Sequence, residues 1–310
     1  MSAPFDREAL RQRRDRAAKG EADAHFLMAE VVDRLAERLD DVTRPFPRAA
    51  VVGAWRGEIA RALLARPSTE SVVQVEPSLG LARLAAEAAP VAVGDEERLP
   101  LAPGSLDLIV APLLLHWTND LPGALIQMRR ALRPDGLLLA AMLGAGTLAE
   151  LRGCLTEAEV EATGGLSPRF APLAEIRDLG GLLQRAGLAL PVADREAITV
   201  RYGDPLRLLR DLRAMAETAA LAERRRVFLR REVLARGLAL YAERHADAEG
   251  RVTATFELAF LHGWAPHESQ QQPLRPGSAK MRLAEALGTE ERRAGDTVPG
   301  DRARGDTTRH

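Results

Sequence analysis

Short apolar segments alternate with amphipathic helical segments in the first half of the chain, and this alternation constrains the fold more than any other feature. Strands buried on both faces read as apolar runs, whereas helices that cover a sheet place apolar residues at helical spacing. The pattern therefore predicts an α/β fold with a parallel sheet covered on both faces. The expected strands cover 49–53, 71–76, 90–93, 106–112 and 136–142, and the expected helices cover 57–65, 79–88 and 120–132.

Segments outside this region extend the predicted core. Two helices are expected before it, over 5–19 and 23–40, and the sequence RPDG at 133–136 is expected to form a turn with positive φ at Gly136. After residue 150 we expect a helix over 173–188, a strand over 196–203, helical stretches over 204–216 and 221–245, and a strand over 253–264.

These expectations give a domain organisation in five parts. The segment after residue 203 is interpreted as an insertion that covers the ligand end of the sheet, and the last residues lack apolar periodicity, which is typical of disorder. The parts are a helical lead-in (1–45), a core (46–203), a helical insertion (204–250), the last strand with its following loop (251–287) and a disordered tail (288–310).

Composition and charge exclude several classes of protein. The formal net charge is −1, so a general nucleic-acid-binding surface is not expected. Cys154 is the single cysteine, which excludes an internal disulfide framework and an all-cysteine metal site. The apolar stretches around 106–115 and 136–149 are too short to span a bilayer. The N-terminal segment contains Asp6, Glu8 and Asp15, unlike a targeting peptide, and we expect a cytoplasmic protein.

A glycine-containing turn follows the first predicted strand, in the sequence VVGAWRGE. Against a dinucleotide-binding fingerprint, only Gly53 of the three expected glycines is present. Against the turn of a methyltransferase, Gly53 and Gly57 are present and Trp55 stands where the middle glycine is expected. The turn therefore favours a methyltransferase-type cofactor over a dinucleotide.

Acidic residues stand at the ends of the next two predicted strands. Glu76 ends the second strand, where a carboxylate can accept both hydroxyls of a ribose. Asp95 follows the third strand and can accept from an adenine amino group, and the backbone amide of Glu96 can donate to a ring nitrogen. The alternative interpretation of these acids is a solvated, charged surface.

The segment GDEERLPLAPGSLDLIVAPLLLHWTNDLPGALIQMRRALRPDG (94–136) resembles the class I S-adenosylmethionine-dependent methyltransferases. The resemblance is strongest to the branch that contains the malonyl-carrier-protein methyltransferase and the respiratory complex I assembly factors. The block GWAPHESQ (263–270) points to the assembly factors, whose branch implies hydroxylation of an arginine on a complex I subunit. The resemblance implies a Rossmann-like, mostly parallel seven-stranded sheet, S-adenosylmethionine as cofactor and a protein substrate.

Site residues carried over from this family fall in the motifs already described. The predicted cofactor-binding residues are Gly53, Ala54, Trp55, Gly57, Glu76, Asp95, Glu96, Pro112 and Leu113. Two positions depart from the family pattern: Val51 replaces an acidic residue that helps to anchor the amino group of the cofactor, and Trp55 replaces a glycine. The adenosine half of the site is therefore expected to be intact and the methionine half altered.

Candidate catalytic residues follow the fourth strand and the later strands. His116 and Trp117 are expected at the reacting centre, with His116 as a possible general base, and Tyr202 and Trp264 are expected to face the pocket. The alternative for His116 and Trp117 is a cap and core packing, with Asn119 as the N-cap of the next helix. His262, His267 and Glu268 are interpreted as a structural or partner-binding loop, and no metal site is predicted.

Two other functions remain open from the sequence. The chain could methylate malonyl-carrier protein or a small molecule at oxygen, which would require turnover of the cofactor. It could instead be a non-catalytic assembly chaperone that has lost the cofactor, which Val51 and Trp55 favour and Glu76 and Asp95 oppose.

Overall fold

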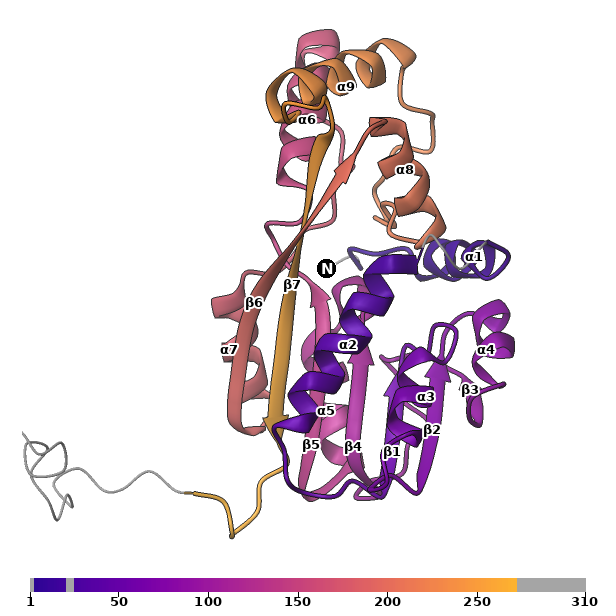
Figure 1. The fold of residues 1–310 in the computed structure, drawn as a ribbon, viewed down its shortest axis with the longest axis vertical. Coiled ribbons are helices and arrows are strands. Elements are labelled where there is room, and N and C mark those ends of the chain that lie inside the picture. The colour runs from indigo at the N-terminus through magenta and orange to yellow at the C-terminus, as the bar shows by residue number, and fades with distance from the viewer. Residues whose placement is uncertain (1–2, 21–24, 272–310) are drawn as a thin grey trace, which may run out of the picture. The chain divides into compact units, whose positions relative to one another are not determined.

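Seven strands form one mixed sheet in the computed structural model, which describes residues 3–20 and 25–271 (Figure 1). The strand order is β3-β2-β1-β4-β5-β7-β6. The strands are β1 (Arg48–Val52), β2 (Ser71–Glu76), β3 (Val91–Val93), β4 (Leu106–Pro112), β5 (Leu132–Leu143), β6 (Ala189–Tyr202) and β7 (Val252–Trp264).

The first five strands run parallel to one another, and β7 runs antiparallel to both of its neighbours. The parallel register places the ends of β1, β2 and β4 at one edge, where Val51 pairs with Gln74 on one side and Val110 on the other. This is the edge at which open α/β sheets bind ligands. The prediction of a Rossmann-like, mostly parallel seven-stranded sheet with flanking helices is confirmed.

Helices cover both faces of the sheet, as Figure 1 shows. The helices α2 and α3 lie on one face, and α5 and α7 lie on the other. The helices are α1 (Arg7–Ala17), α2 (Phe26–Asp40), α3 (Glu58–Leu64), α4 (Leu79–Ala85), α5 (Leu121–Ala131), α6 (Ala149–Thr163), α7 (Ile176–Arg185), α8 (Pro205–Ala214) and α9 (Arg231–His245).

Alternate residues of the central strands belong to two separate hydrophobic cores. Val51 and Val110 pack with α2 and α3, whereas Ala50 and Ile109 pack with α5 and α7. All four are buried, because side chains alternate between the two faces of a sheet and both faces are covered here. This double burial explains why the strands are apolar throughout.

Strands β6 and β7 extend beyond the ends of the other strands, toward α6 and α9 (Figure 1). The helices α6 and α9 pack closely where Gly237 faces Leu155, since a Cβ on Gly237 would lie 2.6 Å from Leu155 Cδ2.

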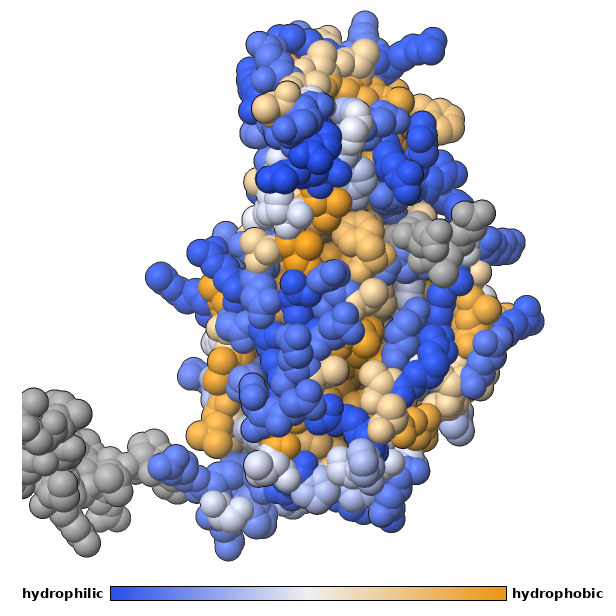
Figure 2. All heavy atoms as spheres, viewed as in Figure 1, coloured by the Kyte–Doolittle hydropathy of each residue, from blue (hydrophilic) through white to orange (hydrophobic). Residues whose placement is uncertain are grey.

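Figure 2 shows hydrophilic residues interspersed with small hydrophobic groups on the viewed face. Among the described residues, none of the helices combines the length and the apolar composition needed to cross a membrane.

Two local predictions are wrong. Residues 133–136 lie within β5, and the positive φ of 64° belongs to Asp135 instead of Gly136. Residues 221–230 are not helical, because the backbone at 220–222 pairs with the N-terminal segment: Asp6 N donates to Ala220 O at 2.7 Å and Ala222 N donates to Pro4 O at 2.9 Å. The predicted tail at 288–310 lies outside the described residues.

Candidate functional site

The turn after β1 has the backbone conformation that its glycines predict. Gly53 and Gly57 have φ of 88° and 86°, and a Cβ on Gly53 would lie 2.9 Å from Leu114 Cβ. Trp55 has φ of 52°, in the left-handed region that favours glycine, although its indole is buried. The turn therefore has positive φ at all three positions where glycines were expected, and it carries a large ring at the middle one.

Glu76 ends β2 next to this turn and is completely buried. Its Oε2 accepts from Trp55 N at 3.0 Å and its Oε1 from Ser78 N at 3.1 Å. Arg14 of α1 donates to the same carboxylate through Nε at 2.8 Å and Nη2 at 2.7 Å. These four bonds use the acceptor capacity of the carboxylate.

Arg14 is buried as well, with 2% of its surface exposed. Its guanidinium also lies 4.9 Å from the ring centroid of Trp55. Burial alone would lower the pKa of Arg14, but the charge and hydrogen bonds of Glu76 outweigh burial and raise it above the ordinary value. The Arg14 guanidinium therefore stays charged although it is buried.

Two further arginines of α1 bind the acids that follow β3. Arg7 Nη1 lies 2.6 Å from Glu96 Oε1, Arg7 Nη2 lies 3.1 Å from Asp95 Oδ1, and Arg11 Nη2 lies 3.3 Å from Asp95 Oδ2. Burial raises the pKa of Glu96, and Arg7 opposes this effect. Carboxylate oxygens of Asp95, Glu96 and Glu97 lie within 4.8 Å of one another, and the guanidinium groups of α1 supply the opposite charge to the first two.

The structure thus brings Glu76, Asp95 and Glu96 to the same edge of the sheet, together with Gly53, Ala54, Trp55 and Gly57. It also covers them with α1. The acceptors proposed for a ribose and an adenine amino group are bonded to Arg14, Arg7 and Arg11. In this arrangement the residues do not fit S-adenosylmethionine, because the carboxylate of Glu76 has no acceptor position left for ribose hydroxyls.

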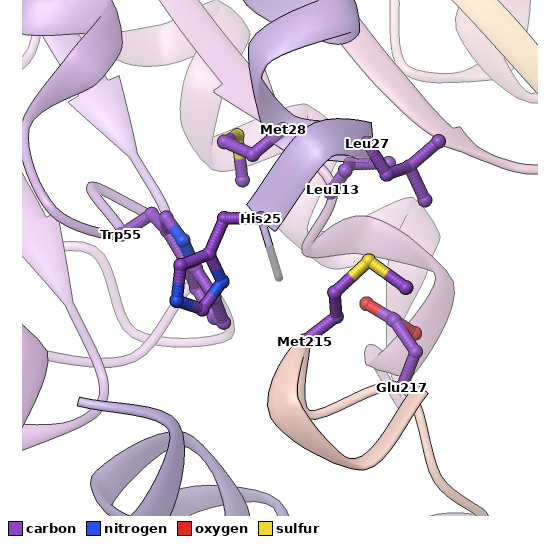
Figure 3. A pocket seen from close by; sticks show the side chains of 7 residues that line it. All are labelled: His25, Leu27, Met28, Trp55, Leu113, Met215 and Glu217. Atoms are coloured by element: carbon purple, nitrogen blue, oxygen red, sulfur yellow. The ribbon is translucent and has the colours of Figure 1, made fainter. Parts of the chain in front are cut away.

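A small cavity lies beside Trp55, in the methionine half of the expected site (Figure 3). Its volume of about 10 Å³ is close to the minimum for one water molecule. The ring of His25 packs edge-on against Trp55 at 5.2 Å, and neither ring nitrogen of His25 nor Trp55 Nε1 has a hydrogen-bond partner among the described residues. Met215 and Glu217 approach the cavity from the loop after α8, as Figure 3 shows.

The segment after β4 carries the predicted floor and the predicted catalytic residues. Pro112 ends β4, and Leu113 lines the small cavity, with its N–H donating to Ala141 O at 2.8 Å. His116 and Trp117 form a buried 3₁₀ turn over Leu115–Trp117. Neither residue caps α5: its N-cap is Asp120, and the predicted cap Asn119 instead accepts from Phe5 N at 2.8 Å.

Glu217 contacts His116 and Trp117 and lines a second cavity. Glu217 was not identified from the sequence as a site residue. Its Oε2 lies 3.0 Å from His116 Nε2 and accepts from Trp117 Nε1 at 3.1 Å. Leu143 N donates to His116 Nδ1 at 3.5 Å, so a neutral His116 carries its proton on Nε2 and donates it to Glu217. No local sequence signal marks Glu217, because its partners lie 100 and 101 residues earlier.

The second cavity has a volume of about 230 Å³ and opens beside His116 and Trp117. Most of its walls are apolar side chains of α6, of α8 and of the segment before α7, and Glu217, Arg152 and Arg169 supply its charges. A cavity beside the segment that follows β4, lined by helices α6 and α8, is suited to a substrate group.

Other predicted site residues lie elsewhere. Tyr202 is buried at the end of β6 and lines neither cavity. Trp264 cannot share a pocket with it: Tyr202 pairs with Val252 and Trp264 with Ala189, at opposite ends of the β6–β7 ladder. His262 lies near that second end, beside Arg38 and Asp194, and burial lowers its pKa.

The strand order, the glycine turn and the acids at the strand ends together define a class I methyltransferase fold. Residues 51–140 match a family model described as a methyltransferase domain. The YcgJ protein from Bacillus subtilis has the same fold, with a TM-score of 0.54 at 13% identity over 76% of this chain and 99% of that chain.

Two curated relatives are more similar in sequence. The mitochondrial arginine-hydroxylase NDUFAF5 of Danio rerio is 37% identical over 91% of this chain and 88% of that protein. The malonyl-[acyl-carrier protein] O-methyltransferase of Laribacter hongkongensis is 34% identical over 88% of this chain and 94% of that protein. The chain belongs to the class I S-adenosylmethionine-dependent methyltransferase superfamily, within the group that includes these arginine hydroxylases and malonyl methyltransferases.

We expect Arg14→Ala to lower the free energy of unfolding by about 3–5 kcal/mol, because it leaves the buried Glu76 charge without its partner. Arg14→Leu combined with Glu76→Leu should lose less than the sum of the two single changes, since the residues are coupled. Arg16→Ala, on the exposed side of the same helix, is the control and should change stability by less than about 0.5 kcal/mol. Urea denaturation measures all five variants, including the two single Leu changes, and equal losses for Arg14→Ala and Arg16→Ala would contradict the assignment.

A second prediction concerns pH. Burial, and secondly Arg56, lower the pKa of His25 from 6.5 to about 4, so between these values the unfolded chain binds a proton that the folded protein does not. The contribution of His25 to stability should be complete above pH 6.5 and should decline as the pH falls toward 4. His25→Leu should therefore flatten the fall of the urea midpoint between pH 7 and pH 5 relative to the wild type. An unchanged slope would show that His25 titrates normally.

Proposed function

We propose that this protein modifies an arginine side chain of a protein substrate during the assembly of respiratory complex I. The family resemblance described above implies this setting, and the name of the Danio rerio relative supports arginine hydroxylation as the reaction. The structural observation that supports the proposal is the cavity of about 230 Å³ at the end of β4, because it brings His116 and Trp117 together with a carboxylate. In the proposal His116 and Trp117 border the reacting centre.

We also propose that the chain binds S-adenosylmethionine only when α1 releases the acids at the strand ends. Gly53, Gly57, Glu76, Asp95 and Glu96 are the residues that would then hold the cofactor. The support is their convergence at one edge of the sheet, and the obstacle is their present occupation by the arginines of α1. Opening α1 would lower the apparent affinity in proportion to the fraction of molecules that are open.

A non-catalytic assembly chaperone is the second candidate, and the Arg14–Glu76 pair favours it. If α1 never leaves, the acids serve the fold instead of a ligand, and the protein could act only by binding its partner. Methylation of malonyl-carrier protein is the third candidate, which the Laribacter hongkongensis relative and the cationic Arg152 in the larger cavity support.

The proposed partner is a subunit of complex I, and the proposed location is the cytoplasm. The protein would then meet the membrane complex from its inner side. The buried free thiol of Cys154 is compatible with a reducing compartment.

Deletion of the gene should remove a modification from one arginine of a complex I subunit, which peptide mass spectrometry of the purified complex measures. The mass difference distinguishes an added oxygen from an added methyl group. Wild-type protein should restore the modification, and His116→Phe should not, because it removes the polar group at the reacting centre. Failed assembly with no modified arginine in the parent strain would favour the chaperone instead.

Weakening the attachment of α1 away from the acids should tighten cofactor binding. Arg224 lies 2.8 Å from Asp6 in a partly exposed ion pair, and such pairs contribute at most about 1 kcal/mol, so Arg224→Gln should raise the apparent affinity for S-adenosylmethionine up to about fivefold. Isothermal titration measures the change, with the neighbouring, exposed Arg225→Gln as the control.

Weaker binding by Arg224→Gln than by its control would mean that α1 in its present position is part of the cofactor site. No binding by any form at millimolar ligand, a scale of about −4 kcal/mol, would favour the chaperone.

A further inference from the structure

The loop that carries Glu217 is hydrogen-bonded to α8 on one side and to the N-terminal segment on the other. Glu217 N donates to Leu212 O at 2.8 Å, directly after Ala216, whose φ of 62° ends α8 sharply. Beyond it, Thr218 O accepts from Arg13 Nη1 at 2.8 Å and Ala220 O accepts from Asp6 N at 2.7 Å. The position of the carboxylate is therefore fixed by contacts on both sides.

Only one oxygen of the Glu217 carboxylate is hydrogen-bonded to described residues. Oε2 receives both His116 and Trp117, whereas Oε1 makes no hydrogen bond to any of the described residues. The side chain is 7% exposed and lines both the small cavity at Trp55 and the larger cavity. The second oxygen of this carboxylate therefore lies in a site with little contact with water, where a cationic ligand group would stabilise its charge.

The remaining walls of the larger cavity suit the aliphatic part of a long side chain. Leucines of α6 and α8 and the ring of Phe170 form an apolar passage, and the indole of Trp117 lies beside Glu217. The volume of about 230 Å³ is below that of most pockets for whole small molecules, which begin near ~300 Å³. A single side chain that ends in a cation fits this combination.

Two arginines also line the cavity, and their positive charges would oppose a cationic ligand unless they are neutralised. Arg169 is neutralised by Glu159, which accepts from its Nε at 3.0 Å and its Nη2 at 2.7 Å. Arg152, on α6, makes no ion pair with Glu217. It could attract an acidic ligand, and this is the competing occupant.

We propose that Glu217 determines substrate specificity by binding the guanidinium of the substrate arginine inside this cavity. The proposal rests on the proposed function and adds the residue that selects the side chain. A guanidinium fits better than an ammonium, because it is more weakly hydrated and stacks on aromatic rings such as Trp117 and Phe170. Its methylene groups would lie along the leucines, and its N–H groups would donate to Glu217 Oε1.

The indole N–H of Trp117 provides a direct readout, because it donates to Glu217. The chain has three tryptophans, so the three indole signals in a ¹⁵N spectrum of the full-length protein can be assigned with Trp→Phe variants. N-acetyl-L-arginine methylamide should shift the Trp117 signal in a saturable way. The citrulline analogue, which has the same shape without the charge, should bind at least tenfold more weakly.

Glu217→Gln should also weaken binding of the arginine probe at least tenfold, because it removes the charge and keeps an oxygen that can accept from Trp117. Retention of the Trp117 indole signal in this variant shows that the loop is still folded. Glu223→Gln, which changes an exposed carboxylate in the same connection, is the matched control and should bind as the wild type does.

Three results would overturn the proposal: equal affinity for the arginine and citrulline probes, an unchanged affinity in Glu217→Gln, or a shift of the Trp117 signal by malonate with none by the arginine probe. A lysine probe that binds as tightly as the arginine probe would also overturn the preference for a guanidinium. This titration is independent of the deletion strain. Arginine binding without a modified complex I subunit would reject the proposed function alone, and the reverse result would reject the role of Glu217 alone.

Discussion

The buried ion pair between Arg14 and Glu76 determines how the ligand end of this fold is arranged. Glu76 lies at the end of β2, and its four bonds attach the turn at Trp55, the start of α4 at Ser78 and the helix α1 to one carboxylate. Loss of the guanidinium would leave a fully buried carboxylate with only two backbone donors, which is why removal of Arg14 should cost more than removal of the more exposed Arg11.

The same pair sets the condition for ligand binding. Ribose hydroxyls and a guanidinium can both donate two hydrogen bonds to a carboxylate, but the guanidinium also neutralises its charge. A nucleoside could displace α1 only if its other contacts offset the loss of four ion pairs between arginines of α1 and the acids, together with the exposure of the buried residues of α1. Trp55 makes this harder, because its indole occupies space beside the acid and contacts Arg14. The methyltransferase fold is thus compatible with a closed form in which arginines of α1 bind the acids that would otherwise bind adenosine.

Sequence reasoning predicted the sheet, the two flanking layers and the convergence of Glu76, Asp95 and Glu96, because apolar periodicity is local and parallel strands end at a common edge. The sequence does not reveal the partners of these acids. Arg14 lies 62 residues before Glu76, and the amphipathic pattern of its helix is the same whether Arg14 faces solvent or an acid. Glu217 was missed for the same reason. The predictions of a turn at 133–136 and a helix at 221–230 were wrong because both segments bond to distant backbone, at Ala265 in the first case and Pro4 in the second.

The N-terminal segment contacts both the acids of the expected cofactor site and the loop that carries Glu217. Residues 4–14 contact both sites: Pro4, Asp6 and Arg13 bind the loop of Glu217, while Arg7 and Arg14 bind the acids at the strand ends. Helix α1 therefore cannot leave Glu76 and Glu96 as a rigid body without breaking its bonds to residues 218–222. Any ligand that displaces α1 from the acids must also loosen the loop that positions Glu217 beside His116. Occupancy of the two cavities is coupled through this segment, and the sign of the coupling depends on whether α1 returns once the ligand is bound.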